Sequence, residues 1–331
     1  MLNLQTASNS TLNWLLQDKE PKCSTASGFS QDVFFNHIRE SYSLLHDLKT
    51  PLSNIPLQSY KACDYKGTYF NVVVEIECLL KDNADLFKHF LIHGSVSDMS
   101  WVNGWSDFDA MAVIRHTALL EKNRQRLLSV SYKLDALMRT VDPLQHHGIH
   151  FIHEFELNNF PNLYLPKNIL SKAKCLLGSA NIGVISSWQS GLLETTRFNA
   201  ILHTLESASS SGILKHHAKN GQYLLEDFHN EKALYQLKYF LCIIMLLPCY
   251  WANLRGVYLD KPEAYQLLYS EIKDFDFEIL KAATKIRKEW DINRTDAHSN
   301  KIPDWIKNTL GNSYLTRGHS FAKELSKKNV S

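Results

Sequence analysis

Two carboxylates and a Gly-Ser pair within residues 91–114 are the side chains of this chain best suited to chemistry. Asp107 and Asp109 are one residue apart, so in an extended strand both carboxylates project from one face and repel each other. A divalent cation removes this repulsion, and Mg²⁺ is typically held by one or two carboxylates together with substrate phosphates. Gly94 lets the backbone approach a phosphate closely, and Ser95 adds a hydroxyl and an N–H donor. The segment therefore predicts a site for magnesium and phosphate.

The order of these residues resembles the signature of the nucleotidyltransferase superfamily. In that signature an apolar strand ends in Gly-Ser, a loop follows, and Asp-x-Asp lies in a second strand. Here the loop runs from Val96 to Ser106, and apolar residues 110–114 follow Asp109. The resemblance covers only these two dozen or so positions, 91–114, but it joins the acidic pair to Gly-Ser at a suitable spacing.

The resemblance implies transfer of a nucleoside monophosphate from an NTP, the co-substrate, to a hydroxyl-bearing acceptor, with release of pyrophosphate. It assigns Asp107 and Asp109 as catalytic residues and ligands of Mg²⁺ (or Mn²⁺). It assigns Gly94 and Ser95 as contacts of the β- and γ-phosphates. Such a reaction depends on positioning and on neutralising phosphate charge more than on covalent chemistry.

The superfamily usually supplies a third carboxylate from a later strand, as a metal ligand or general base. The candidates are Glu154 and Glu156, which are two residues apart and share one face of a strand expected at 148–157. We prefer Glu154 as the third catalytic residue because it lies deeper in that strand, and Glu156 stays open as the alternative. If neither adjoins the pair, the chain would bind nucleotide without turning it over.

The fold class expected from the chain is α+β, with a small mixed-sheet nucleotidyltransferase head followed by an all-α helical bundle. We expect a polar N-terminal arm at 1–30, the nucleotidyltransferase domain at 31–165 and a helical substrate-side domain at 166–331. In the head, helices are expected at 31–50, 85–90 and 117–138, whereas 69–76 fits a strand or the start of a helix. Beyond 166, apolar residues recur at three- and four-residue spacing in segments near 167–177, 187–207, 213–228, 231–254, 262–273, 276–290 and 303–325.

Residues 255–272 resemble the end of the bundle in aminoglycoside nucleotidyltransferases of the streptomycin and spectinomycin type. Asp260 is a good N-cap, Pro262 suits the first helical turn, and Glu263 stands where a capping box places it. This second resemblance supports the helical bundle more than it supports a particular substrate.

Composition and charge indicate which classes of acceptor and partner to expect. The chain of 331 residues has a formal net charge of +2, which disfavours a nucleic-acid acceptor because polynucleotide binding favours a basic stripe. We therefore expect a small-molecule acceptor, with a protein acceptor or a non-catalytic, nucleotide-binding scaffold as alternatives. The apolar run 239–251 is too short to span a bilayer and contains Pro248, so it predicts a buried helix and no membrane association. Six scattered cysteines without CxxC spacing fit reduced thiols in a cytoplasmic protein.

Aromatic and imidazole side chains near the site allow more than one interpretation. Trp101 and Trp105 lie in the loop before Asp107, where each could stack on a base or acceptor ring or pack against the following helix. The histidines around the third strand, including His150 and His153, lack the closed spacing of a zinc site. We expect them to be surface or edge residues.

Overall fold

The computed structural model describes residues 53–142, 144, 149–160, 167–185, 192–216, 221–224, 233–273, 276–297, 299 and 301–328. The expected arm at 1–30 and helix at 31–50 lie outside these residues. The described residues form two compact units. The first comprises positions up to 101 and from 106 to 187, and the second comprises Val102–Trp105 and the positions from 188 onward. Both helices and strands are present, so the prediction of an α+β protein is confirmed at that level.

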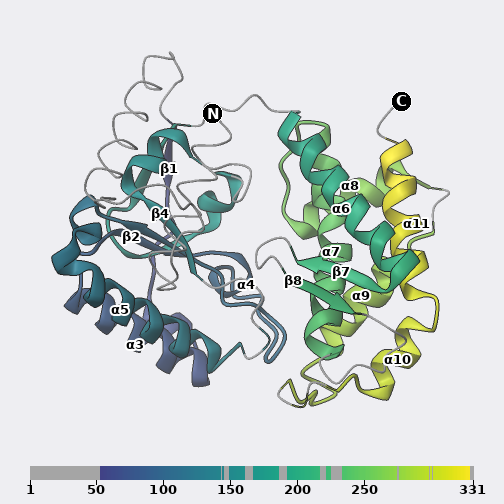
Figure 1. Cartoon of the computed structure of the whole chain (residues 1–331), viewed down its shortest axis with the longest axis horizontal. Coiled ribbons are helices and arrows are strands. Elements are labelled where there is room, and N and C mark those ends of the chain that lie inside the picture. The colour runs from purple at the N-terminus through teal and green to yellow at the C-terminus, as the bar shows by residue number, and fades with distance from the viewer. Residues whose placement is uncertain are drawn as a thin grey trace, which may run out of the picture. The chain divides into compact units, whose positions relative to one another are not determined.

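The first unit is built on a four-stranded mixed sheet in the order β4-β3-β2-β5. Strand β2 pairs antiparallel with both β3 and β5, whereas β3 pairs parallel with β4. Helices α3 (Gly67–Asp82) and α5 (Glu121–Arg139) lie along one face of this sheet (Figure 1). The strands are β2 (Phe87–Ile92), β3 (Ala110–Ile114), β4 (Ile149–His153) and β5 (Lys174–Leu177).

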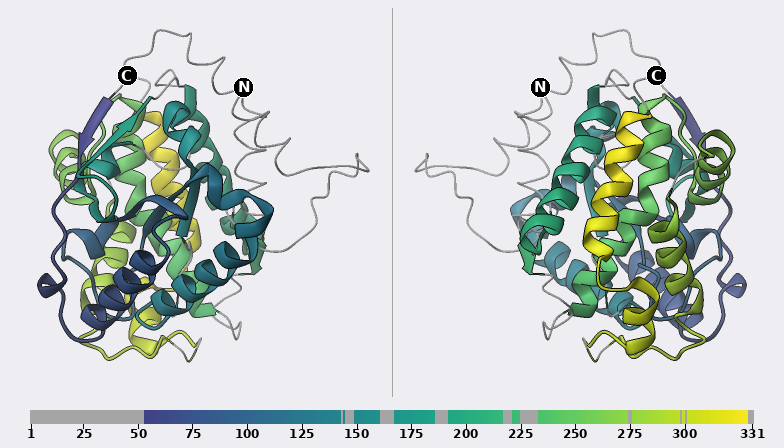
Figure 2. Two further views of the ribbon diagram at one scale, coloured as in Figure 1. Left: turned by 90° about the vertical axis from the view of Figure 1, so that its left-hand side faces the viewer. Right: turned by 90° about the vertical axis from the view of Figure 1, so that its right-hand side faces the viewer.

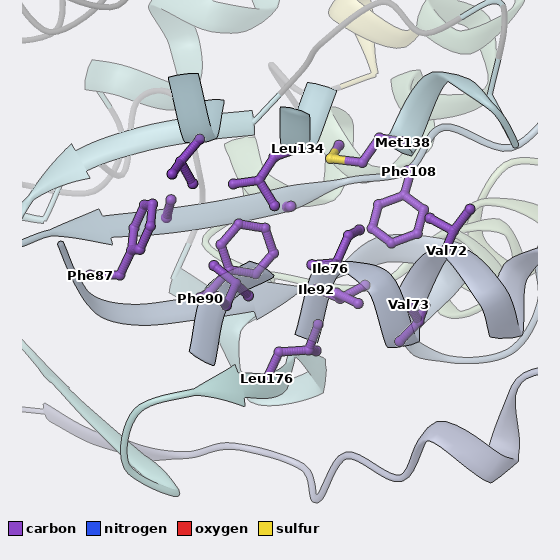
Figure 3. Close-up of a cluster of buried hydrophobic side chains, with 14 of the residues drawn as sticks. Val72, Val73, Ile76, Phe87, Phe90, Ile92, Phe108, Leu134, Met138 and Leu176 are labelled. Atoms are coloured by element: carbon purple, nitrogen blue, oxygen red, sulfur yellow. The ribbon is translucent and has the colours of Figure 1, made fainter. Parts of the chain in front are cut away.

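The core between the helices and the sheet explains these elements. Val72, Val73 and Ile76 of α3 recur at helical spacing and belong to one buried cluster with Phe87 and Phe90 of β2 (Figure 3). The β-branched residues of 69–76 therefore form a helix, because the helix buries them on one face. Residues 87–90, expected at the end of a helix, instead belong to β2, whose pattern is buried almost throughout. That expectation was wrong because a short apolar run does not distinguish strand from helix.

The opposite face of the sheet is covered by a second apolar cluster. Leu91, Met111, Val113 and Ile152 contribute to it from three neighbouring strands. Shorter elements complete it, namely β1 (Ser53–Pro56), which pairs antiparallel with β6 (Asn181–Val184), and the 3-10 helices η3 (Glu154–Asn159) and η4 (Lys167–Lys172). The helix expected near 167–177 is thus wrong, because this segment forms η4 and then pairs with β2 as β5. The first unit therefore includes η4, β5 and β6.

Unit two is mainly helical. Helices α6, α7 and α11 lie side by side in it (Figure 2). The hairpin of β7 (Ile213–His216) and β8 (Gly221–Leu224) occupies part of the segment expected to be helical at 213–228, so this unit is not all-α. The helices are α6 (Leu192–Ser211), α7 (Ala233–Leu254), α8 (Lys261–Glu271), α9 (Glu278–Glu289), α10 (Asp304–Leu310) and α11 (Tyr314–Lys327).

Two local expectations for this unit are confirmed. The run 239–251 lies within α7, which is long and apolar enough to cross a membrane by length and composition but is largely buried inside the protein. Asp260 caps α8: its carboxylate accepts the Glu263 N–H at 2.9 Å, and the Glu263 carboxylate accepts the Asp260 N–H at 3.1 Å. These reciprocal bonds form the capping box that the sequence predicted.

Candidate functional site

Gly94 forms a tight turn at the end of β2. It opens the short helix α4 (Gly94–Ser97) with a φ of +66°, a conformation that L side chains rarely adopt. A Cβ atom at this position would lie 2.5 Å from Oδ2 of Asp109, so only glycine fits without displacing that carboxylate. The structure therefore brings Gly94 and Asp109 together, with Ser95 following directly in α4.

Asp107 and Asp109 directly precede β3, at the end of the sheet where Gly94 follows β2. The His93 N–H donates to the Asp109 carbonyl at 3.0 Å and continues the β2–β3 ladder to this residue. Phe108 is fully buried in the core beneath α3 and α5, whereas Met111 and Val113 belong to the opposite cluster. Alternation along the strand then assigns both carboxylates to the face opposite the two helices. Both remain partly exposed.

Asp142 is a carboxylate of this site that the sequence did not reveal. Its Oδ2 accepts the backbone N–H of Phe108 at 2.9 Å, and both residues are fully buried. A buried backbone N–H that lacks an acceptor costs about 1–3 kcal/mol, and Asp142 supplies that acceptor. Asp142 follows α5 and is 34 positions from Phe108, so no local pattern could have indicated this contact. It fixes the backbone between Asp107 and Asp109.

Glu154 does not adjoin the aspartate pair. The parallel register sets Ala110 beside Ile149 and Ile114 beside His153, so Glu154 follows the far end of β4. Five strand residues separate that end of β3 from Asp109, roughly 16 Å. This placement corrects the expectation that Glu154 is the third catalytic carboxylate. The expected strand ends at His153, and Glu154 begins η3.

Local contacts give Glu154 a structural role. Its Oε1 accepts the His116 N–H at 2.7 Å at the start of the 3-10 helix η2 (His116–Leu119), and its Oε2 lies 3.5 Å from Lys88 Nζ. Glu156, the alternative, is fully buried at the same end, where its Oε2 accepts the His153 N–H at 2.6 Å and completes a capping box of η3. Neither glutamate is placed beside the aspartate pair.

The strand next to the pair carries histidine instead. His150 is aligned with Met111 of β3, on the face that alternation assigns to Asp109. Over the described positions, no group of three His, Cys, Asp or Glu side chains is arranged to hold a metal ion. Mg²⁺ commonly takes further ligands from phosphates and water where protein carboxylates supply only one or two.

His153 is buried rather than at the surface, which differs from the expectation for this histidine. Burial, followed by the neighbouring His116 charge, lowers the pKa of His153 to about 3. Its neutral ring accepts the Phe155 N–H at 3.2 Å through Nδ1. These contacts make His153 a structural residue of the β4–η3 junction.

The loop tryptophans pack against protein side chains. Within the first unit, Trp101 stacks on Tyr69 of α3 with ring centroids 4.8 Å apart, and on Tyr65 at 5.9 Å. Within the second unit, Trp105 meets the edge of Trp290 at 4.8 Å and is only 3% exposed. The packing interpretation holds for both residues, although their partners belong to elements other than the helix that follows the loop.

Comparisons with known protein families, with characterised proteins and with solved structures find no significant match for this chain. The case for a function accordingly depends on the residues and geometry of the site.

Proposed function

We propose that this protein is a Mg²⁺-dependent nucleotidyltransferase that transfers a nucleoside monophosphate from an NTP to a hydroxyl-bearing small molecule. The observation that carries the proposal is the seating of the Gly94 turn against the Asp109 carboxylate. Gly94 has a left-handed backbone conformation, is exposed to solvent and lies beside one of the two carboxylates. Such a turn suits the binding of a phosphate next to a metal ion.

Each residue has a distinct role in this proposal. Asp107 and Asp109 hold Mg²⁺, which when bound neutralises the triphosphate and lowers the pKa of the attacking hydroxyl. Gly94 and Ser95 contact the β- and γ-phosphates through backbone and, at Ser95, through the hydroxyl. Asp142 holds the Phe108 amide and so fixes the backbone from which both metal ligands project. The acceptor oxygen bonds to the α-phosphorus and its proton passes to solvent water. The bond between the α-phosphorus and the oxygen that bridges to the β-phosphorus breaks, and pyrophosphate leaves.

A small acceptor agrees best with the balance of charge. The net charge of +2 supplies no strong field for a polynucleotide. The second unit, mainly helical, is the proposed substrate-side part of the protein. An acceptor hydroxyl on another protein is the alternative within the same reaction class.

Nucleotide binding without transfer is the second candidate function. The position of Glu154 and Glu156 at the opposite end of β4 favours it, because neither can act as the third carboxylate beside Asp109. In this case Asp107, Asp109 and the Gly94 turn would still bind Mg·NTP, and the protein would act as a nucleotide-responsive scaffold.

One experiment separates the two candidates. The four NTPs are tested with and without Mg²⁺ by thermal shift, and pyrophosphate release is then measured with a panel of hydroxyl acceptors. A ligand at 100 times its Kd stabilises the folded state by about 2.7 kcal/mol, which such a shift detects. Asp135→Asn is the matched control for Asp107→Asn, because Asp135 is a partly exposed acid on α5 that pairs with Arg139. Binding with pyrophosphate release supports transfer, binding without release supports the scaffold, and no Mg²⁺-dependent binding refutes both.

A further inference from the structure

The loop that joins Gly94-Ser95 to the aspartate pair is shared between the two units. Residues 102–105 belong to the second unit, while Trp101 and Ser106 on either side belong to the first. We name Val102–Trp105 the anchor segment. Trp105 within it is 3% exposed, and its ring centroid lies 4.8 Å from that of Trp290, the C-cap residue of α9.

Three residues of the anchor segment, Asn103, Gly104 and Trp105, lie against side chains of the second unit. The Lys238 ammonium of α7 lies 5.9 Å from the Trp105 ring centroid, a cation–π distance. Gly104, at a φ of +71°, lies so close to Trp290 that an added Cβ would be 3.3 Å from its Nε1. Asn103 Nδ2 donates to Asp291 Oδ2 at 3.2 Å. Successive residues of one short segment thus contact the same end of α9.

The same loop is fixed a second time in the first unit. Trp101 stacks on Tyr65 and Tyr69, and Met99 before it takes a φ of +65°, a conformation that is costly for a non-glycine residue. Four residues farther along, Trp105 is fixed in the second unit. Each tryptophan is thus held by ring packing within its own unit.

Asp107 follows Trp105 by two residues, so the two Cα atoms are at most about 7 Å apart. We propose that Trp105 is a positioning residue: its ring packing holds the anchor segment, and the anchor segment restrains Asp107 and the entry into β3 through the peptide chain. The expected consequence, tighter binding of Mg·NTP, rests on the proposed function.

The direct test is hydrogen exchange of the full-length protein. Trp105→Ala is compared with Trp305→Ala, because Trp305 also packs on Trp290, at 6.5 Å, but belongs to α10 and not to the loop. Both variants remove a ring from the same aromatic cluster. We expect Trp105→Ala alone to speed exchange of the His93 and Phe108 amides, which donate to Asp109 and Asp142. Unchanged exchange there, or equal acceleration in Trp305→Ala, would overturn the proposal.

A second measurement tests whether the anchor segment affects nucleotide affinity. Since a displacement of about 1 Å can cost 100-fold in a preorganised site, we expect Trp105→Ala to weaken Mg·ATP binding by about 10- to 100-fold and Trp305→Ala by less than about twofold. Equal weakening in both would overturn the inference. If the wild-type protein binds no Mg·NTP, the proposed function fails, and the exchange comparison still decides the role of Trp105. Asn103→Ala, which removes only the bond to Asp291, replaces Trp105→Ala if that variant does not fold, with smaller changes expected in the same direction.

Discussion

Substituting Gly94 by alanine tests the closest contact in the candidate site. Gly94 has a φ of +66°, and an alanine Cβ would lie 2.5 Å from Asp109 Oδ2. The left-handed conformation costs a non-glycine residue about 1–2 kcal/mol. Relief of the contact requires a further shift of roughly 1 Å by the Asp109 carboxylate, given ordinary separations near 3.5 Å. A displacement of that size in a preorganised site is expected to weaken Mg·ATP binding by about 100-fold, or about 2.7 kcal/mol.

The chain contains a matched control at the start of α3. Gly67 has a φ of +57°, and an added Cβ there meets no atom within 4 Å. Gly67→Ala therefore carries the same backbone strain without the contact to a carboxylate. We expect both variants to lose about 1–2 kcal/mol of folding stability, and only Gly94→Ala to lose Mg·ATP affinity.

Chemical denaturation gives the stability of each variant, and isothermal titration calorimetry gives its Kd for Mg·ATP. The reasoning is refuted if Gly94→Ala binds Mg·ATP within about twofold of Gly67→Ala, since a 1 Å displacement of a metal ligand is expected to cost far more. It is also refuted if Gly67→Ala loses as much affinity as Gly94→Ala, because backbone strain alone would then account for the effect.

Further outcomes follow from the same geometry. Replacing Asp107 and Asp109 together with asparagine should abolish Mg²⁺-dependent nucleotide binding while circular dichroism shows an intact fold, because the paired charges repel without metal; an unfolded double variant would mark them as structural. Asp142→Ala should weaken nucleotide binding more than Asp142→Asn in calorimetry, since an asparagine oxygen still accepts the Phe108 N–H; equal losses would show that charge matters more than position. Glu154→Gln should leave nucleotide binding and turnover unchanged in titration and pyrophosphate assays, because Glu154 contacts His116 at the far end of the sheet; a large fall in turnover would contradict that placement. Burial, then the charges of neighbouring basic residues, lowers the pKa of His89 from 6.5 to about 4, so the unfolded state binds more protons in this window and stability should fall as pH drops from about 6.5 to about 4. Urea unfolding at several pH values should show that the unfolding free energy of His89→Gln depends less on pH than that of the wild type. An unchanged pH dependence would show that His89 is not the source of the effect.

Much of the local chemistry was determined by the sequence itself. Two-residue alternation predicted that Asp107 and Asp109 share one face, and the structure fully buries Phe108, which lies between them. The pattern Asp260–Glu263 predicted a capping box, and the structure contains it. A run of apolar residues predicted a buried helix, now seen within α7. Each of these features depends on neighbours within one strand or one or two helical turns, which the order of residues specifies directly.

Other features were decided only by tertiary structure, because they depend on the pairing of distant segments. The parallel register between β3 and β4 places Glu154 away from the aspartates, and no residue pattern within β4 specifies that register. Asp142 reaches Phe108 across 34 positions through the packing of α5 on the sheet. Trp105, close to the aspartates in sequence, packs with the helical unit because its ring is buried against Trp290.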